Sequence, residues 1–275
     1  MNDPGQSTVV TSAARENAHD LYLSALLAPR GKRADLIALA AFEGELNRVA
    51  VAASEAIHGE FRLQWWRDLI DEQSDAAASG NPIADALRDV VVRHGISREG
   101  LRASIDARSA ELDPGEIANM PAFLAYLDMA DGAALARAAH VLLSRAPMRA
   151  ENDFLVPAGR AVALARLAYQ SSLGHPPIAR LVSDLEHRCV IPRQMPSQRA
   201  GEWLVAEARR QLRAAREVIS VQTSATRRSA LLLALVEPQL HAWEGHDPST
   251  GDVPRPILPL SRVWRLWRLA RLGTL

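Results

Sequence analysis

The chain has 275 residues, 48% of them hydrophobic, which is enough to build a sizeable core in one large domain or two small ones. It carries 32 basic and 32 acidic residues, so its formal net charge is zero, and this balance argues against a nucleic-acid partner. All of the basic residues except Lys32 are arginine. Such a bias is typical of a GC-rich genome and is weak evidence of binding by itself.

A single cysteine, Cys189, excludes an intramolecular disulfide and suits a reducing compartment. The first ten residues lack the charged and apolar regions of a signal peptide. No apolar run reaches the length of about 18 residues that a membrane-spanning helix needs. We therefore expect a cytoplasmic protein, either free or peripheral to the inner membrane.

Helix-forming alanine, leucine, arginine and glutamate dominate the sequence, which predicts an all-α fold. Residues 1–11 are expected to be a disordered lead and residues 12–275 to form one domain. Within it, Gly95 is predicted to end one helix and Ser97 to cap the next. Residues 178–198 show the least regular pattern. In chain order, we expect helices at about 12–27, 32–57, 60–74, 83–93, 97–111, 120–143, 156–173, 201–223, 226–241 and 260–272.

One face of the predicted helix at 32–57 begins apolar and then carries Glu43 and Asn47 one turn apart. Polar groups on an inward face must be hydrogen-bonded or must face a cavity, so this pair is a candidate for lining one. One carboxylate and one amide do not make a Mg²⁺ site, and the histidines are scattered singly, so no metal site is predicted. Asp106 and Arg108 are two residues apart and should not face one another on a helix.

Three segments, in this order, resemble the squalene/phytoene synthases: Ala38-Leu-Ala-Ala-Phe42, Leu63-Gln-Trp-Trp-Arg67 and Phe123-Leu-Ala-Tyr-Leu127. The resemblance extends over roughly residues 15–270 and is closest at 36–72 and at the C-terminus. It implies a single isoprenoid-synthase-type helical domain around a central cavity, in which active members condense two prenyl diphosphates.

Active members of that family hold Mg²⁺ with two Asp-rich motifs on facing helices, because diphosphate leaves only when its developing charge is neutralised. In this chain the first motif falls on Asn47-Arg-Val-Ala-Val51, and the paired acids of the second fall on Gln170 and Gly174. No carboxylate of either motif is present. The sequence therefore resembles a degenerate branch of the family, which contains a mitochondrial complex I assembly factor and its bacterial relatives.

That branch implies a protein without Mg²⁺-dependent coupling, without catalytic residues and without a cofactor. It implies an apolar, prenyl or lipid ligand and a respiratory-complex subunit as partners. Two alternatives stay open: an active, Mg²⁺-dependent prenyl diphosphate-condensing transferase, and a purely structural interaction protein whose cavity is filled. The candidates for lining a ligand cavity are Glu43, Asn47, Trp65, Arg67, Tyr126 and Gln170.

The predicted C-terminal helix carries arginines along one half of its circumference, with Val263, Leu266, Trp267 and Ala270 on the opposite side. Basic residues on one side and tryptophan and leucine on the other are typical of an interfacial helix. The alternative is a helix docked on its own domain, with its arginines paired to acids. The candidates for peripheral membrane contact are Arg262, Trp264, Arg265, Trp267 and Arg268.

Overall fold

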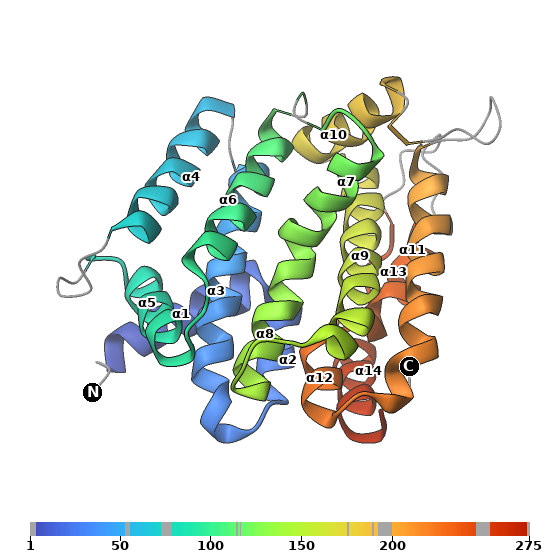
Figure 1. Ribbon diagram of the computed structural model, residues 1–275. Coiled ribbons are helices and arrows are strands. Elements are labelled where there is room, and N and C mark those ends of the chain that lie inside the picture. The colour runs from blue at the N-terminus through green and yellow to red at the C-terminus, as the bar shows by residue number, and fades with distance from the viewer. Residues whose placement is uncertain are drawn as a thin grey trace.

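The computed structural model describes residues 4–52, 56–72, 79–113, 115, 117–174, 176–188, 190–191, 200–245 and 254–273. Every regular element within these residues is a helix, which confirms the predicted all-α fold (Figure 1). Cys189 and residues 1–3 of the predicted lead lie outside the described residues.

The first half of the chain packs around one apolar core. Buried Phe42, Leu46, Leu63, Leu87 and Ile105 belong to this core. Its helices are α1 (Pro4–Asn17), α2 (His19–Leu26), α3 (Arg30–Ala52), α4 (Ala56–Asp71), α5 (Pro82–His94) and α6 (Arg98–Leu112).

Helix α1 begins well before the position that the sequence suggested. A disordered lead was predicted up to residue 11, but the helix starts at Pro4 and ends at Asn17, so this prediction is wrong for residues 4–11. Val10 and Ala14 are both buried in the first core, one helical turn apart. Packing of this short apolar stripe against the core stabilises the helix, although the segment is polar in composition.

The second half packs around a second apolar core, in which Phe123, Leu164, Leu204 and Leu235 are fully buried. Its elements are α7 (Met120–Leu127), the π-helix η2 (Asp128–Gly132), α8 (Ala133–Leu143), α9 (Arg149–Ser172), α10 (Pro176–His187), α11 (Ala200–Val218), the 3₁₀ turn η3 (Ile219–Val221), α12 (Ser224–Ser229), α13 (Leu233–Glu244) and α14 (Pro259–Leu272).

Helices α6 and α8 contribute to both cores and join them. On α6, Ile105 belongs to the first core and Ala110 to the second; on α8, Val141 belongs to the first and Leu135 to the second. Figure 1 shows both helices between the α3, α4 and α5 group and the α9, α11 and α13 group. Polar side chains on this shared region therefore lie at the boundary between two apolar cores.

The helix boundaries agree with the sequence where local signals are strong. Gly95 ends α5 with φ 65°, and the Ser97 hydroxyl accepts a hydrogen bond from the Gly100 amide at 3.1 Å, as predicted. Residues 178–198 were expected to be irregular, yet Pro176–His187 form α10. Pro at the start of a helix costs no hydrogen bond, so Pro176 can begin this helix.

A close backbone crossing ties η2 to α9. A Cβ atom added to Gly159 would lie 2.5 Å from the Cα atom of Gly132. Only glycine allows two backbones to approach this closely. The crossing fixes η2 against α9, and both elements carry charged side chains into the interior.

Candidate functional site

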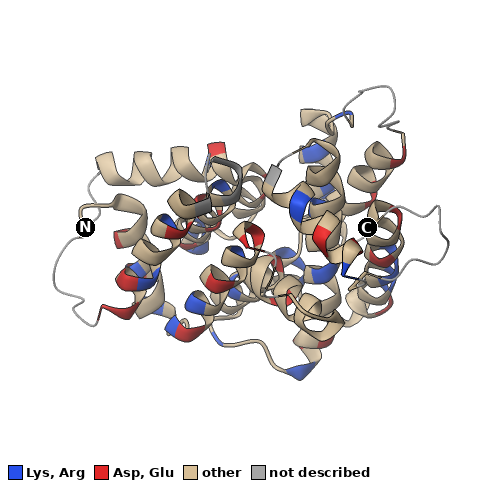
Figure 2. Ribbon diagram, turned by 90° about the horizontal axis from the view of Figure 1, so that it is seen from above, with Lys and Arg blue, Asp and Glu red and all other residues tan. Residues whose placement is uncertain are grey.

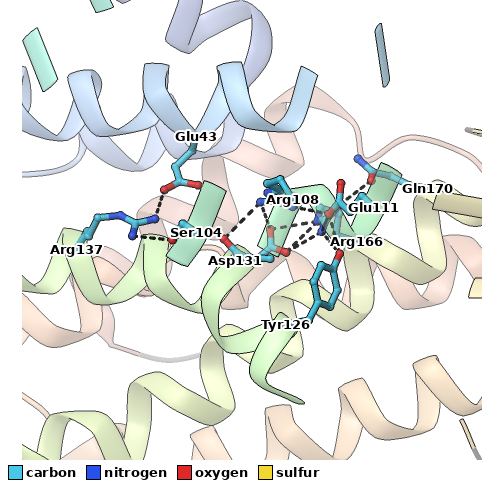
Figure 3. Close-up of polar contacts among 10 residues, drawn as sticks. Glu43, Ser104, Arg108, Glu111, Tyr126, Asp131, Arg137, Arg166 and Gln170 are labelled. Carbon is cyan, nitrogen blue, oxygen red and sulfur yellow. Dashed lines mark hydrogen bonds and ion pairs between the residues drawn. The ribbon is translucent and has the colours of Figure 1, made fainter. Parts of the chain in front are cut away.

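Four charged side chains meet at the boundary between the two cores, and we call them the central ion cluster. They are Arg108 and Glu111 of α6, Asp131 of η2 and Arg166 of α9 (Figure 3). Arg108 and Glu111 are each 1% exposed. Seen from above, charged segments lie on helices in the middle of the molecule as well as at its edge (Figure 2).

The cluster is held by short contacts that centre on one carboxylate oxygen. Glu111 Oε1 accepts hydrogen bonds from Arg108 Nη1 at 2.7 Å, from Arg166 Nη2 at 2.8 Å and from the Tyr126 hydroxyl at 2.7 Å. Arg166 Nε donates to both oxygens of Asp131, at 3.1 and 3.0 Å, and Arg108 lies 3.5 Å from the same carboxylate. The two cations therefore neutralise the two anions within the chain itself.

Local structure places these side chains. Arg108 and Glu111 are three residues apart, so they share the inward face of α6. Asp131 lies in the π-helix, and such wide turns shift the direction of the following side chains. As the spacing predicted, Asp106 does not pair with Arg108, which is two residues away. It pairs with Arg67 of α4, which the spacing did not predict.

The electrostatics keep Glu111 and the two arginines of the cluster charged. Burial alone would raise the pKa of Glu111, but the charges of Arg166 and Arg108 and the Tyr126 hydrogen bond lower it from 4.5 to about 2. Burial would lower the pKa of Arg166, but Asp131 and Glu111 raise it well above its ordinary value. Burial, followed by the Glu111 charge, raises the pKa of Tyr126. The tyrosine is thus a hydrogen-bond donor here and not a proton source.

The donor chemistry at this place does not fit the Mg²⁺ ions that active synthases use. Magnesium needs oxygen ligands in near-ideal octahedral geometry, and an arginine beside each carboxylate competes for those oxygens. Glu111 and Asp131 are already bonded to arginines, and Gln170 accepts from Arg166 Nη1 at 3.0 Å. Among the described residues, no three His, Cys, Asp or Glu side chains are grouped so that they could hold a metal ion.

Glu43 and Asn47 do not bond to each other. Glu43 is buried and pairs through Oε1 with Arg137 of α8, whose Nη1 donates to Ser104 at 2.9 Å (Figure 3). Glu43 Oε2 and Asn47 Oδ1 are shielded from solvent and have no hydrogen-bond partner among the described residues. The helix face singled out from the sequence therefore carries two buried acceptors, and its ion pair is to α8.

Trp65 and Arg67 do not lie with the other candidates. Arg67 donates to Asp106 at 2.7 Å, Glu60 at 2.6 Å and Ser109 at 2.5 Å, which fastens α4 to α6. Trp66 packs edge-on against Phe42 of α3, with ring centroids 5.1 Å apart, while Trp65 is 41% exposed. Helix α4 is thus attached to α3 through Trp66 and to α6 through Arg67.

Two of the predicted cavity residues, Tyr126 and Gln170, are connected by Arg166, which was not predicted. Arg166 contacts the Tyr126 hydroxyl at 3.2 Å and the Gln170 amide at 3.0 Å. Arg166 was not singled out from the sequence, nor were Glu111, Asp131 and Arg137. The spacing of Arg108 and Glu111 on a helix was the available signal, because a buried pair three residues apart can neutralise itself.

A separate pocket of about 460 Å³ lies beside the cluster, and we call it the apolar pocket. Its walls include Ile96, Met129, Ala133, Ala136, Leu155 and Val156. Polar groups at its edge include Asp128, which pairs with Arg160 through two 2.7 Å hydrogen bonds, and Arg137, the partner of Glu43. None of the six predicted cavity residues lines this pocket.

The C-terminal helix α14 combines features of both interpretations drawn from its sequence. Leu266 and Leu269 are buried in the second core, and Arg262 pairs with Asp20 of α2 at 2.8 Å. Trp264 and Trp267, however, are 53% and 43% exposed. No described helix is long and apolar enough to cross a membrane.

The arginines of α14 are used in different ways. Arg268 lies over the Trp264 ring, 4.8 Å from its centroid, a cation–π contact. Arg265 Nε donates to Ser261 Oγ at 3.3 Å. The helix is therefore docked on its domain by one side and presents aromatic rings on the other.

The all-α chain is a helical protein of the isoprenoid-synthase type, because it matches a family with that fold. A sequence model of the squalene/phytoene synthase family matches residues 14–248, and the chain belongs to that family.

Curated relatives carry one shared description, "NADH dehydrogenase (ubiquinone) complex I, assembly factor 6". The chain is 32% identical to the Bos taurus protein and 31% identical to the Homo sapiens protein over 99 residues, which are 36% of this chain and 30% of each relative. It is 27% identical to the Mus musculus protein over 132 residues, 48% of this chain and 40% of that relative. The matched segments thus span less than half of the relatives' length.

Proposed function

We propose that this chain is a non-catalytic member of the squalene/phytoene synthase family that supports the assembly of respiratory complex I. The observation that carries the proposal is the central ion cluster. Its two carboxylates, Glu111 and Asp131, are neutralised by Arg108 and Arg166 at the boundary between the two cores. The similarity to complex I assembly factors supports the direction of the proposal.

The physical reason is that the cluster is complete without a ligand. Diphosphate chemistry needs cations that are free to neutralise the leaving group. Arg108 and Arg166 are instead committed to internal carboxylates, and separating such a buried pair leaves uncompensated charge at a cost of roughly 3–5 kcal/mol. A metal-bound diphosphate would have to meet this cost before it could bind.

The experiment is disruption of the gene for this chain in its own host. Assembled NADH:quinone oxidoreductase, measured by native gel and by NADH oxidation in membranes, is expected to fall, while the other respiratory complexes keep their levels. Re-expression of the chain is expected to restore it. Unchanged complex I after disruption, or loss of a prenyl-derived product instead, contradicts the proposal.

We further propose that the apolar pocket binds an apolar chain of the prenyl or lipid type. Its volume of about 460 Å³ lies within the range of about 300–1,000 Å³ that is typical of ligand sites, and its walls are largely apolar. Arg137 connects the pocket to Glu43, and Met129 connects it to the π-helix that carries Asp131. A ligand here would therefore contact Arg137 and the π-helix, while the charged side chains of the central ion cluster lie outside the pocket lining.

Geranylgeraniol is a suitable probe because it has the chain without the diphosphate. It is expected to raise the melting temperature of the protein, and Ala136→Phe, which fills the pocket, is expected to abolish the rise. Ala206→Phe, at an exposed position of α11, is the matched control. An equal rise in the wild type and in Ala136→Phe would exclude this pocket.

We also propose that α14 contacts a membrane surface. Leu260, Val263, Trp264 and Trp267 are exposed on this helix, and tryptophan favours the boundary between water and lipid. This contact would place the protein where a membrane-bound respiratory complex is assembled.

A further inference from the structure

A second, smaller pocket lies where α14 meets the N-terminal helices. Its volume is about 240 Å³, and its walls are formed by the connection between α2 and α3 together with residues of α12 and α14. Figure 1 shows α2, α12 and α14 at the same end of the molecule. We call it the arginine pocket because Arg33, Arg228 and Arg271 all line it.

Among the described residues, the arginines of this pocket have no acidic counter-ion. Its lining contains no Asp or Glu, and within the described part of the chain none of its three arginines forms an ion pair with a carboxylate. Arg33 uses Nε to donate to the Ala28 carbonyl at 2.9 Å, and Arg228 Nε is shielded from solvent without a hydrogen-bond partner among the described residues. A buried donor without an acceptor costs free energy, which an incoming anion would recover.

The charge belongs to the side chains and not to helix dipoles. The N-terminus of α3 and the C-terminus of α2 both border the pocket, and their partial charges have opposite signs. Three guanidinium groups, by contrast, offer planar pairs of donors that match a phosphate. A volume below that of a typical drug-sized site suits a headgroup and not a whole lipid.

Trp267 joins this pocket to the exposed face of α14. Its ring lines the arginine pocket and is also 43% exposed. Leu260 is 86% exposed and Trp264 is 53% exposed on the same helix. Residues 254–273 contain five arginines and no acidic residue, so the surroundings favour an anionic surface.

We propose that the arginine pocket binds the phosphate headgroup of an anionic phospholipid while Trp264, Trp267 and Leu260 enter the membrane interface. The inference rests on the proposed membrane contact of α14 and specifies which lipid that contact selects. Headgroup binding would hold α14 parallel to the surface, because Arg271 lines the pocket near the C-terminal end of the helix while Leu260 enters the interface near its N-terminal end.

Vesicle flotation of the full chain tests the inference with two compositions, phosphatidylcholine alone and an equimolar mixture with phosphatidylglycerol. Binding is expected to the mixture only. Since each arginine near an anionic surface contributes about 1 kcal/mol, Arg228→Gln/Arg271→Gln is expected to weaken binding by roughly 20- to 30-fold. Arg271→Gln alone, at an exposed position, is expected to weaken it several-fold and covers the case in which the Arg228 change disturbs folding.

The control is Arg62→Gln/Arg180→Gln, which removes two exposed arginines from α4 and α10 with the same change in net charge. Equal weakening of vesicle binding by both double variants would mean that binding depends on general charge attraction. This result would overturn the proposal that the arginine pocket binds the headgroup.

If Trp264→Ala abolishes vesicle binding but the arginine substitutions leave it unchanged, the inference is overturned, while the proposed membrane contact of α14 stands. No vesicle binding, with arginine-dependent binding of inorganic phosphate or of an acidic peptide instead, would overturn both.

Discussion

Replacing Glu111 by glutamine removes one charge from the central ion cluster and almost nothing from its shape. The folded-state pKa of Glu111 falls from 4.5 to about 2, and each pKa unit corresponds to about 1.4 kcal/mol, so the ionised carboxylate stabilises the fold by roughly 3 kcal/mol. Breaking one member out of a buried ion pair gives a similar range, about 3–5 kcal/mol. We therefore expect Glu111→Gln to lower the free energy of unfolding at pH 7 by roughly 3–5 kcal/mol.

The pH dependence separates this explanation from simple loss of packing. Because the folded-state pKa lies below the unfolded one, the contribution of Glu111 is complete above about pH 4.5 and is lost as the pH falls toward about 2. In acid, Glu111 of the wild type becomes protonated and neutral. The difference in free energy of unfolding between the wild type and Glu111→Gln should therefore shrink over the same pH interval.

Urea unfolding followed by circular dichroism, at pH 7 and at steps below pH 4.5, measures both effects. Glu99→Gln, an exposed position on the same helix, is the matched control and should change stability by less than about 1 kcal/mol. A difference below about 1 kcal/mol for Glu111→Gln at pH 7, or one that stays constant into acid, would refute the reasoning.

Two further substitutions test the packing around the cluster. Gly159→Ala should lower the free energy of unfolding by about 1–3 kcal/mol in thermal or urea denaturation, because its Cβ atom would lie 2.5 Å from backbone. The control Gly31→Ala, whose Cβ atom would have no neighbour within 4 Å, should be neutral or stabilising. Equal effects of the two substitutions would contradict the close crossing. Arg67→Lys should lower the free energy of unfolding by about 1–2 kcal/mol, because lysine cannot reproduce the guanidinium contacts to Asp106, Glu60 and Ser109. The control Arg62→Lys, on the same helix, should change it by no more than about 0.5 kcal/mol. An unchanged stability of Arg67→Lys would mean that these contacts do not stabilise the packing of α4 on α6.

The sequence predicted the features that depend on neighbouring residues. Gly95 and Ser97 were read correctly as the end of one helix and the cap of the next, since both signals lie within a few residues of their effect. That Asp106 does not pair with Arg108 also followed from helix geometry. Helix α10 was missed because the pattern over residues 178–198 looked irregular, although buried Ile178 and Leu181 mark its apolar stripe.

The candidate site was harder to predict because its contacts join distant residues. Arg166 and Glu111 are 55 positions apart, and no local pattern specifies their pairing. Tyr126 and Gln170 were selected by resemblance to the synthases, and the arginine between them becomes visible only in the folded chain. The resemblance to the synthases identified the positions where metal ligands are missing. The structure adds that an internal ion cluster is present at the boundary between the two cores.

The most direct test of the central claim is diphosphate release by the purified protein. It would be incubated with Mg²⁺ and either farnesyl or geranylgeranyl diphosphate, and free diphosphate would be measured beside an active squalene or phytoene synthase. The account predicts no release above the level without protein, because Arg108 and Arg166 are bonded to Glu111 and Asp131. Mg²⁺-dependent release with formation of a coupled prenyl product would contradict it.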